Sequence, residues 1–174
     1  MKKIEHLKGW SLTGSNPELY ELITDSKIVY SGKQSALLHS INEASPREFS
    51  TMRQGIQAHN YKGKRVKLSC FLKTEKVTKC TVWMSVTNPL GDIIQFDNMD
   101  NRPIRGTIDW KNYHIVLDVP EDSASIFFGV QLAGCGKVWV DKFHFEIVDT
   151  NIPSTNTLAH DQLPEQPVNL LFSN

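Results

Sequence analysis

The chain has 174 residues, 40% of them hydrophobic, which suits one domain with a full core and a tail. Its 19 basic side chains balance 19 acidic ones, so net charge gives no reason to expect direct binding of nucleic acid or an anionic membrane. The start MKKIEHLKGW has no apolar segment after its lysines, and no later run reaches the roughly 18 apolar residues of a membrane span. We therefore expect a cytoplasmic protein that contacts neither a membrane nor, directly, nucleic acid.

Segments with alternating apolar and polar side chains, separated by turn residues, fill the first half of the chain. The strands expected from this pattern are 20–24, 35–41, 48–58, 64–75, 80–88 and 92–97. Inward-facing residues are expected to be Val66, Leu68, Cys70 and Leu72 in the fourth of these, and Val82, Met84 and Val86 in the fifth. The polar loop 98–109 follows. Long loops often carry function, although Asp and Asn side chains can equally brace such a loop internally.

Three longer apolar runs between Trp110 and Val148 are expected to form a meander of strands, each closed by a turn. The residues expected to face inward are Tyr113, Ile115, Leu117 and Val119, then Ala124, Ile126, Phe128, Val130 and Leu132, then Trp139, Phe143, Phe145 and Ile147. Asp141 falls in phase with the last set. We therefore expect its carboxylate to be at least partly buried and to need partners.

The three cysteines, an odd number, do not suggest a disulfide framework. If 64–75 and 80–88 form a hairpin, Cys80 lies opposite about Thr74, several residues along the ladder from Cys70. That separation exceeds the reach of a disulfide. We expect three free and mostly buried thiols.

Strands of this length at short spacing, with almost no helical period, predict an all-β chain folded as a two-sheet sandwich. We expect this domain to occupy residues 1–148. From Asp149 the composition changes to Asn, Pro, Ser, Thr and Gln, so 149–174 is expected to be an irregular, extended tail.

Several segments resemble the galactose-binding-domain-like jelly rolls, a group that includes many carbohydrate-binding modules. The segments are GWSLTGSNPELYEL, SGKQSALLHS, QGIQAHNYKGKRVKLSCFLKTE and GTIDWKNYHIVLDVPEDSASIFFGVQLAGCGKVWVDKFHFEIV, within residues 4–148. The resemblance implies an antiparallel jelly-roll sandwich. Similar domains occur in bacteria attached to transcriptional regulators or hydrolases, and the ending PVNLLFSN resembles the start of another such module.

In the usual jelly-roll order, the strands 48–58, 125–133, 80–88 and 92–97 share one sheet, and the concave face of that sheet is the usual sugar site. Aromatic rings stack on the C–H faces of a sugar, while amide, carboxylate and guanidinium groups match its hydroxyls. The outward residues on which we base a ligand site are Trp83 as stacking platform, Phe127, and the polar side chains Arg53, Gln57, Gln95, Asp97 and Gln131.

Each of these residues also has a structural interpretation. Trp83 is a normal residue for covering a sheet face under a loop or the tail. Arg53 and Asp97 could form an ion pair with each other. Both interpretations are open at this stage.

In relatives of this fold, an acidic residue near Asp141 ligates a structural calcium ion. The resemblance thus implies a calcium site at Asp141, with Asp25 and Glu5 assisting, and hard oxygen ligands fit that ion. The alternative is that Asp141 accepts hydrogen bonds from Ser35 or backbone N–H groups without a metal. No other cofactor is implied.

We expect a non-catalytic module that binds a saccharide or another small polar ligand. The alternative is a regulatory or protein-interaction domain, an effector domain related to a bacterial transcriptional regulator, that binds a partner or a second copy of itself. A hydrolase is the least favoured alternative, because neither Asp97 and Asp100 nor any other pair of carboxylates stands out. The sequence has no nucleophile elbow, Walker loop or zinc motif, and His144-x-Glu146 alone is a weak zinc signal.

Overall fold

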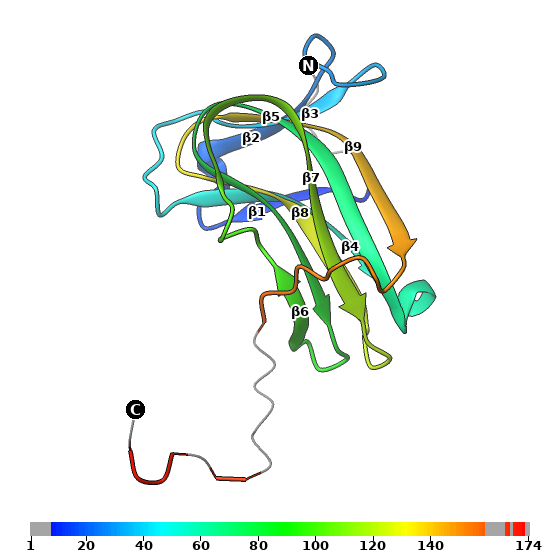
Figure 1. Ribbon diagram of the computed structural model, residues 1–174. Coiled ribbons are helices and arrows are strands. Elements are labelled where there is room, and N and C mark those ends of the chain that lie inside the picture. Colours follow the sequence, from blue (N-terminus) through cyan, green and yellow to red (C-terminus); the bar gives the residue numbers. More distant parts are fainter. Residues whose placement is uncertain (1–7, 159–165, 168, 173–174) are drawn as a thin grey trace.

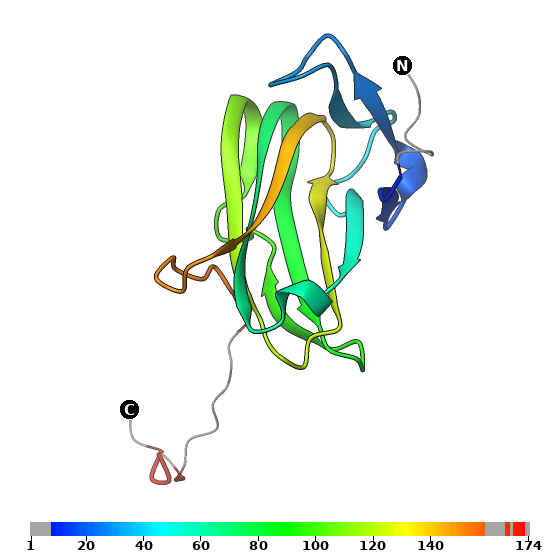
Figure 2. The same cartoon turned by 90° about the vertical axis from the view of Figure 1, so that its right-hand side faces the viewer.

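The computed structural model describes residues 8–158, 166–167 and 169–172. Within them, nine strands are hydrogen-bonded into one antiparallel sheet that folds over into two packed layers, as Figures 1 and 2 show. In this part of the chain, the regular elements besides strands are two short 3-10 turns, η2 (Pro17–Leu19) and η3 (His59–Tyr61). None of the described helices is long and apolar enough to cross a membrane. The all-β sandwich predicted from the sequence is confirmed.

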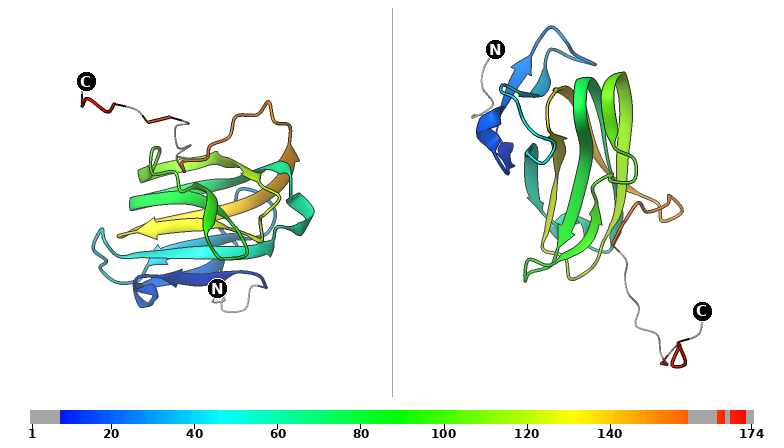
Figure 3. Two further views of the ribbon diagram at one scale, coloured as in Figure 1. Left: turned by 90° about the horizontal axis from the view of Figure 1, so that it is seen from below. Right: turned by 90° about the vertical axis from the view of Figure 1, so that its left-hand side faces the viewer.

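The strands divide between the layers around a single long strand, β5 (Lys64–Thr87). Layer I contains β1 (Ser11–Gly14), β4 (Phe49–Gln57), β8 (Ser125–Ala133), the second half of β5, and β6 (Ile93–Asp97). Layer II contains β2 (Tyr20–Asp25), β3 (Ser35–Ser40), β9 (Lys137–Val148), the first half of β5, and β7 (Ile104–Val119). Seen from below in Figure 3, β8, β4 and β1 lie side by side.

The strand β5 belongs to both layers because it bends without ending. Its register with β7 shifts repeatedly between Leu72 and Cys80, and Lys76 has a φ of 50°, in the left-handed region. The expected hairpin between 64–75 and 80–88 is therefore wrong, because the polar residues between them continue the strand.

The expected meander over residues 110–148 is also wrong. The strands β7, β8 and β9 do not pair with each other: β8 pairs with β4 and β5, β9 with β3 and β5, and β7 with β5. Each connection crosses from one layer to the other, as in a jelly roll. Periodicity identifies the strands but carries no information about which of them pair.

The core lies between the layers and contains most of the residues expected to face inward. Fully buried members include Leu38, Val66, Leu68, Leu72, Val82, Met84, Val86, Ile115, Leu117, Ile126 and Leu132. Trp139 is an exception, because β9 bulges where Lys142 takes a φ of 51° opposite the Ser69/Phe71 irregularity of β5. The extra residue changes the phase of β9, so Phe143 and Phe145 pack on the core while Trp139 packs with Ile23 and Leu37 in a separate cluster.

A short segment after β9, residues 153–158, crosses the open edge between the layers, and we call it the C-terminal strap (Figure 1). On β7, the Thr155 N–H donates to the Val116 carbonyl (2.8 Å) and the Val116 N–H donates to Thr155 Oγ1 (3.0 Å). On β6, the Thr157 N–H donates to the Phe96 carbonyl (2.8 Å) and the Phe96 N–H donates to Asn156 Oδ1 (2.9 Å). The strap thus ties one edge strand of each layer.

The three cysteines are free, as expected. Cys70 and Cys80 both point into the core, where burial raises the pKa of the Cys70 thiol to about 12 and that of Cys80 still further. Cys135 is half-buried, and its Sγ lies 3.3 Å from both the backbone N and the carbonyl of Ala44. A thiol reacts as its thiolate, so the two core cysteines are shielded chemically as well as sterically.

We therefore expect a thiol reagent at mildly alkaline pH to modify Cys135 alone in the native protein, and all three cysteines after denaturation. Cys135→Ser should abolish modification of the folded protein, and two cysteines should still be modified in denaturant. Rapid native modification of Cys70 or Cys80, read by mass spectrometry, would contradict this placement.

Candidate functional site

The outward face of layer I presents polar and aromatic side chains in rows that cross its strands. The register aligns Arg53 on β4, Gly129 on β8 and Trp83 on β5 in one row. The next rows are Thr51, Gln131 and Thr81 on one side, and Gly55, Phe127, Ser85 and Phe96 on the other. Residues directly opposite each other in a ladder project from the same face of the sheet. These three rows form the candidate site.

Two glycines allow the aromatic rings to lie along this face. A Cβ at Gly55 would be 2.6 Å from Cε1 of Phe127, so the Phe127 ring covers the space above this glycine. A Cβ at Gly129 would be 1.9 Å from the Met52 carbonyl oxygen, so β4 and β8 approach more closely there than any side chain permits. Glycine inside a strand commonly marks such a close approach.

The Trp83 indole is held in place by a hydrogen bond. Its Nε1–H donates to Thr51 Oγ1 at 2.7 Å, and Thr51 Oγ1 in turn donates to the Val130 carbonyl at 3.1 Å. Because Thr51 is on β4 and Trp83 is on β5, this bond draws the indole across the intervening strand β8, at Gly129. The half-buried ring is thus fixed along the sheet instead of standing away from it.

Three polar side chains beside the rings are available to a ligand. The Arg53 guanidinium carbon lies 4.7 Å from the centroid of the Phe127 ring, a cation–π contact. Within the described part of the chain, the side chains of Arg53, Gln57 and Gln131 form no hydrogen bond or ion pair. The face therefore combines the aromatic residues Trp83, Phe127 and Phe96 with one guanidinium and two amides whose polar groups are uncommitted among the described residues.

The structure places Arg53, Gln57, Trp83, Phe127 and Gln131 on the outward face of layer I, as predicted from the sequence. The remaining two predicted residues, Gln95 and Asp97, point the other way. They lie opposite the core residues Val86 and Met84 and are 6% and 0% exposed.

The reason is a β-bulge in β6. Thr87 is paired with Ile93, but the next residue of β5, Val86, is paired with Gln95, so Ile94 is an extra residue. An extra residue reverses the faces of all that follow, which brings Phe96 to the outward face and turns Gln95 and Asp97 inward. The prediction that these two residues line the outward face is therefore wrong.

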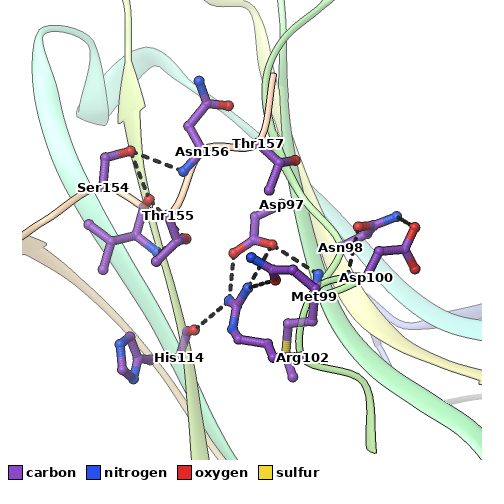
Figure 4. A network of polar contacts seen from close by, with 12 residues as sticks. Asp97, Asn98, Met99, Asp100, Arg102, His114, Ser154, Thr155, Asn156 and Thr157 are labelled. Atoms are coloured by element: carbon purple, nitrogen blue, oxygen red, sulfur yellow. Dashed lines mark hydrogen bonds and ion pairs between the residues drawn. The ribbon is translucent and has the colours of Figure 1, made fainter. Parts of the chain in front are cut away.

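Asp97 instead organises the edge between β6 and β7 (Figure 4). Its carboxylate accepts hydrogen bonds from both terminal nitrogens of Arg102, at 2.6 and 3.1 Å, and from the Met99 N–H at 2.9 Å. Arg102 also donates to the His114 carbonyl of β7 (3.3 Å). The suggested Arg53–Asp97 ion pair does not form, because these side chains lie on opposite faces of layer I.

The residues proposed for calcium were Asp141 and Asp25, with Glu5, which lies outside the described residues. Asp141 accepts the N–H groups of Tyr30 (2.8 Å), Ser31 (3.1 Å) and Lys142 (2.8 Å). Both Asp25 oxygens also accept N–H groups, including Nε1–H of Trp139 at 3.0 Å.

These N–H donors point at the oxygens that a cation would need, and no three His, Cys, Asp or Glu side chains in the described residues cluster as a metal site. Asp141 thus makes the backbone N–H contacts of the metal-free alternative, and through them it anchors the loop after β2.

Sequence reasoning missed four residues that shape the face: Gly55, Gly129, Thr81 and Phe96. The glycines carried a usable signal, since glycine within a β-rich apolar run indicates a bulge or a close contact. Phe96 carried no such signal, because the face on which its side chain lies depends on the bulge at Ile94.

No protein-family model matches the chain. It is 49% identical, over 167 residues, to the "Uncharacterized HTH-type transcriptional regulator YbfP" of Bacillus subtilis (strain 168). The match includes 95% of the chain and 57% of the regulator, so the chain spans a little over half the length of this relative.

Solved structures with the same fold are much more distant in sequence. A xylan-binding CBM22-1 domain from Paenibacillus barcinonensis Xyn10C superposes with a TM-score of 0.55 at 15% identity, covering 82% of this chain and 87% of that one. The enzymatically active domain of tailspike protein 4 from bacteriophage CBA120 gives a TM-score of 0.63 at 12% identity, covering 84% of this chain but 20% of that one. At such identities these matches show the fold alone, and they confirm the expected jelly roll.

We expect Gly129→Ala to destabilise the protein by about 2–3 kcal/mol, because the new methyl group meets backbone that cannot rotate away. Gly55→Ala is the matched control, since its methyl group meets only the Phe127 ring, and it should cost about 1 kcal/mol or less. Urea unfolding measures both. Equal losses in the two variants would show that the strands do not approach closely at Gly129.

Removal of Arg102 should be costly because, among the described residues, it leaves the buried Asp97 carboxylate with the Met99 N–H as its one hydrogen-bond donor. We expect Arg102→Met to cost about 2–3 kcal/mol, reduced from the value for a fully buried pair by the partial exposure of the arginine. Adding Asp97→Asn should recover part of that loss in urea unfolding. Arg105→Met, at an exposed arginine that bonds only the Thr78 carbonyl among the described residues, should cost less than about 1 kcal/mol.

Proposed function

We propose that this chain is a non-catalytic saccharide-binding domain that binds its ligand on the outward face of layer I. The observation that supports this proposal most directly is the flat Trp83 ring beside the Phe127 ring, over which Arg53 stacks, with guanidinium and amide groups that are uncommitted among the described residues. A pyranose presents C–H groups on its face and hydroxyls around its rim, which are the groups such a surface complements.

The hydroxyls of Thr51, Thr81 and Ser85 lie beneath these groups and are nearly inaccessible, so the ligand is expected to meet the rings, Arg53 and the amides first. The solved structures support the proposal only through their fold, one of them being named as a xylan-binding domain. A hydrolytic role has less support, because Asp97 is paired with Arg102 and Asp100 with Lys79.

A second candidate function is favoured by the relative among the transcriptional regulators. Identity of 49% across nearly the whole chain supports a shared role for this domain. On this proposal the domain is the ligand-sensing part of a cytoplasmic regulator, and binding of a saccharide is the signal. The two candidates are compatible, and in the second the domain would also contact a partner or a second copy of the chain.

The proposed function is tested by calorimetry with a panel of neutral and acidic mono- and oligosaccharides at millimolar concentration. We expect at least one to bind, and Trp83→Ala to abolish that binding by removing the stacking surface. Trp110→Ala is the control, because this half-buried tryptophan packs with Trp139 and Tyr30 on layer II. Failure of the whole panel to bind, or equal loss of binding in both variants, would contradict the assignment of the site.

A further inference from the structure

The charge on the outward face of layer I is unbalanced. Among the described residues of its rows, from Ser11 on β1 to Phe96 on β6, there is no Asp or Glu. Lys79 lies at one end of the face, and its Nζ is already paired with Asp100 at 2.8 Å. Arg53 is therefore the one charged side chain of these described rows that lacks a counter-ion.

Arg53 is also held in a defined position. Its guanidinium stacks over the Phe127 ring, and the Phe127 ring is positioned against Gly55. A half-buried guanidinium without an acceptor has lost part of its hydration and has gained only the modest energy of a cation–π contact. Its planar N–H groups remain arranged to donate two parallel hydrogen bonds to one oxyanion.

The spacing between this cation and the stacking platform suits a sugar ring. Arg53 and Trp83 lie in one row, on either side of Gly129. Two strand spacings place their backbones roughly 9–10 Å apart. The indole reaches across β8 to Thr51, two residues from Arg53 on β4, and the guanidinium lies over Phe127 on the other side of the row. We infer that a sugar ring stacked on the indole can direct an exocyclic group along β4 toward the guanidinium.

From this geometry we propose that the ligand is an acidic saccharide, whose carboxylate or phosphate group binds Arg53 while its ring stacks on Trp83. This inference rests on the proposed saccharide-binding function and narrows it to a class of ligand. A neutral sugar would leave the guanidinium without a charged partner, whereas an acidic sugar supplies it.

The test compares matched sugars by calorimetry: glucose with glucuronic acid and glucose 6-phosphate, and galactose with galacturonic acid. We expect the acidic member to bind at least about tenfold more tightly, as expected for a charge-assisted, two-point contact. Raising the ionic strength should weaken the binding of the acidic sugars and leave the affinity for the neutral sugars unchanged. Preference for the uronic acids or for the phosphate identifies which oxyanion the site accepts, and either preference supports the proposal.

Variants locate the effect. Arg53→Gln should lower the affinity for acidic sugars to that for their neutral counterparts. A circular dichroism spectrum and a urea midpoint that match those of the unsubstituted chain show that the variant is folded. Arg53→Lys should retain part of the preference, because it keeps the charge but loses the two-point geometry. Arg105→Gln is the control for the loss of one positive charge, and it should change neither the affinity for acidic sugars nor that for neutral sugars.

Each other outcome overturns the inference. If neutral and acidic sugars bind with equal affinity, the inference of an acidic ligand is wrong, while the proposed saccharide-binding function stands. If Arg53→Gln keeps the preference for acidic over neutral sugars, the oxyanion binds at another residue and not at Arg53. If none of these sugars and no member of the wider panel binds, both proposals fail.

Discussion

The sandwich depends on the continuity of β5 through its bend. The first half of this strand pairs with β7 and β9, and the second half pairs with β8 and β6, so every layer is built on the same 24-residue segment. Its inward residues, from Val66 to Val86, contribute to the core along the whole length. The left-handed backbone at Lys76 marks the bend between the two halves. Because one strand spans both layers, neither layer can separate from the other without breaking its own ladder.

The candidate site arises from the same close packing of backbones. Where β4 and β8 approach at Gly129, no side chain fits, and the surface above is left free for the indole that crosses it from β5. At Gly55 the ring of Phe127 takes the free space, and Arg53 covers that ring in turn. The aromatic rings can thus lie flat on this face because Gly129 and Gly55 have no side chains beneath them.

The alternation of apolar residues was sufficient to predict the class of fold, the strands and most of the core. It also placed Trp83, Phe127 and Arg53 on the correct face, because β4, β8 and the second half of β5 keep a strict period of two. It failed for Gln95, Asp97 and Trp139, and the cause was a single extra residue in β6 and another in β9.

Bulges of this kind are set by pairing with a neighbouring strand, which a single sequence read by local pattern does not contain. The same limit applies to the pairing of β7, β8 and β9, which are consecutive in the chain but lie in alternating layers. The polar partners of Asp97 came from the turn that follows β6, and those of Asp141 from its neighbour Lys142 and from a loop far from it in sequence. The sequence pattern indicated that Asp141 needed partners, but not which groups would supply them, and it placed Asp97 on the outward face.

The C-terminal strap has a further consequence for how the molecule behaves in concentrated solution. Edge strands offer unpaired backbone groups to other chains, which is a common route to aggregation. Here the N–H and C=O groups of Phe96 on β6 and of Val116 on β7 are already occupied by Asn156, Thr157 and Thr155. Six residues of irregular chain thereby block intermolecular pairing at one position on each of two sheet edges, a role for which neither regular secondary structure nor a hydrophobic contact is needed.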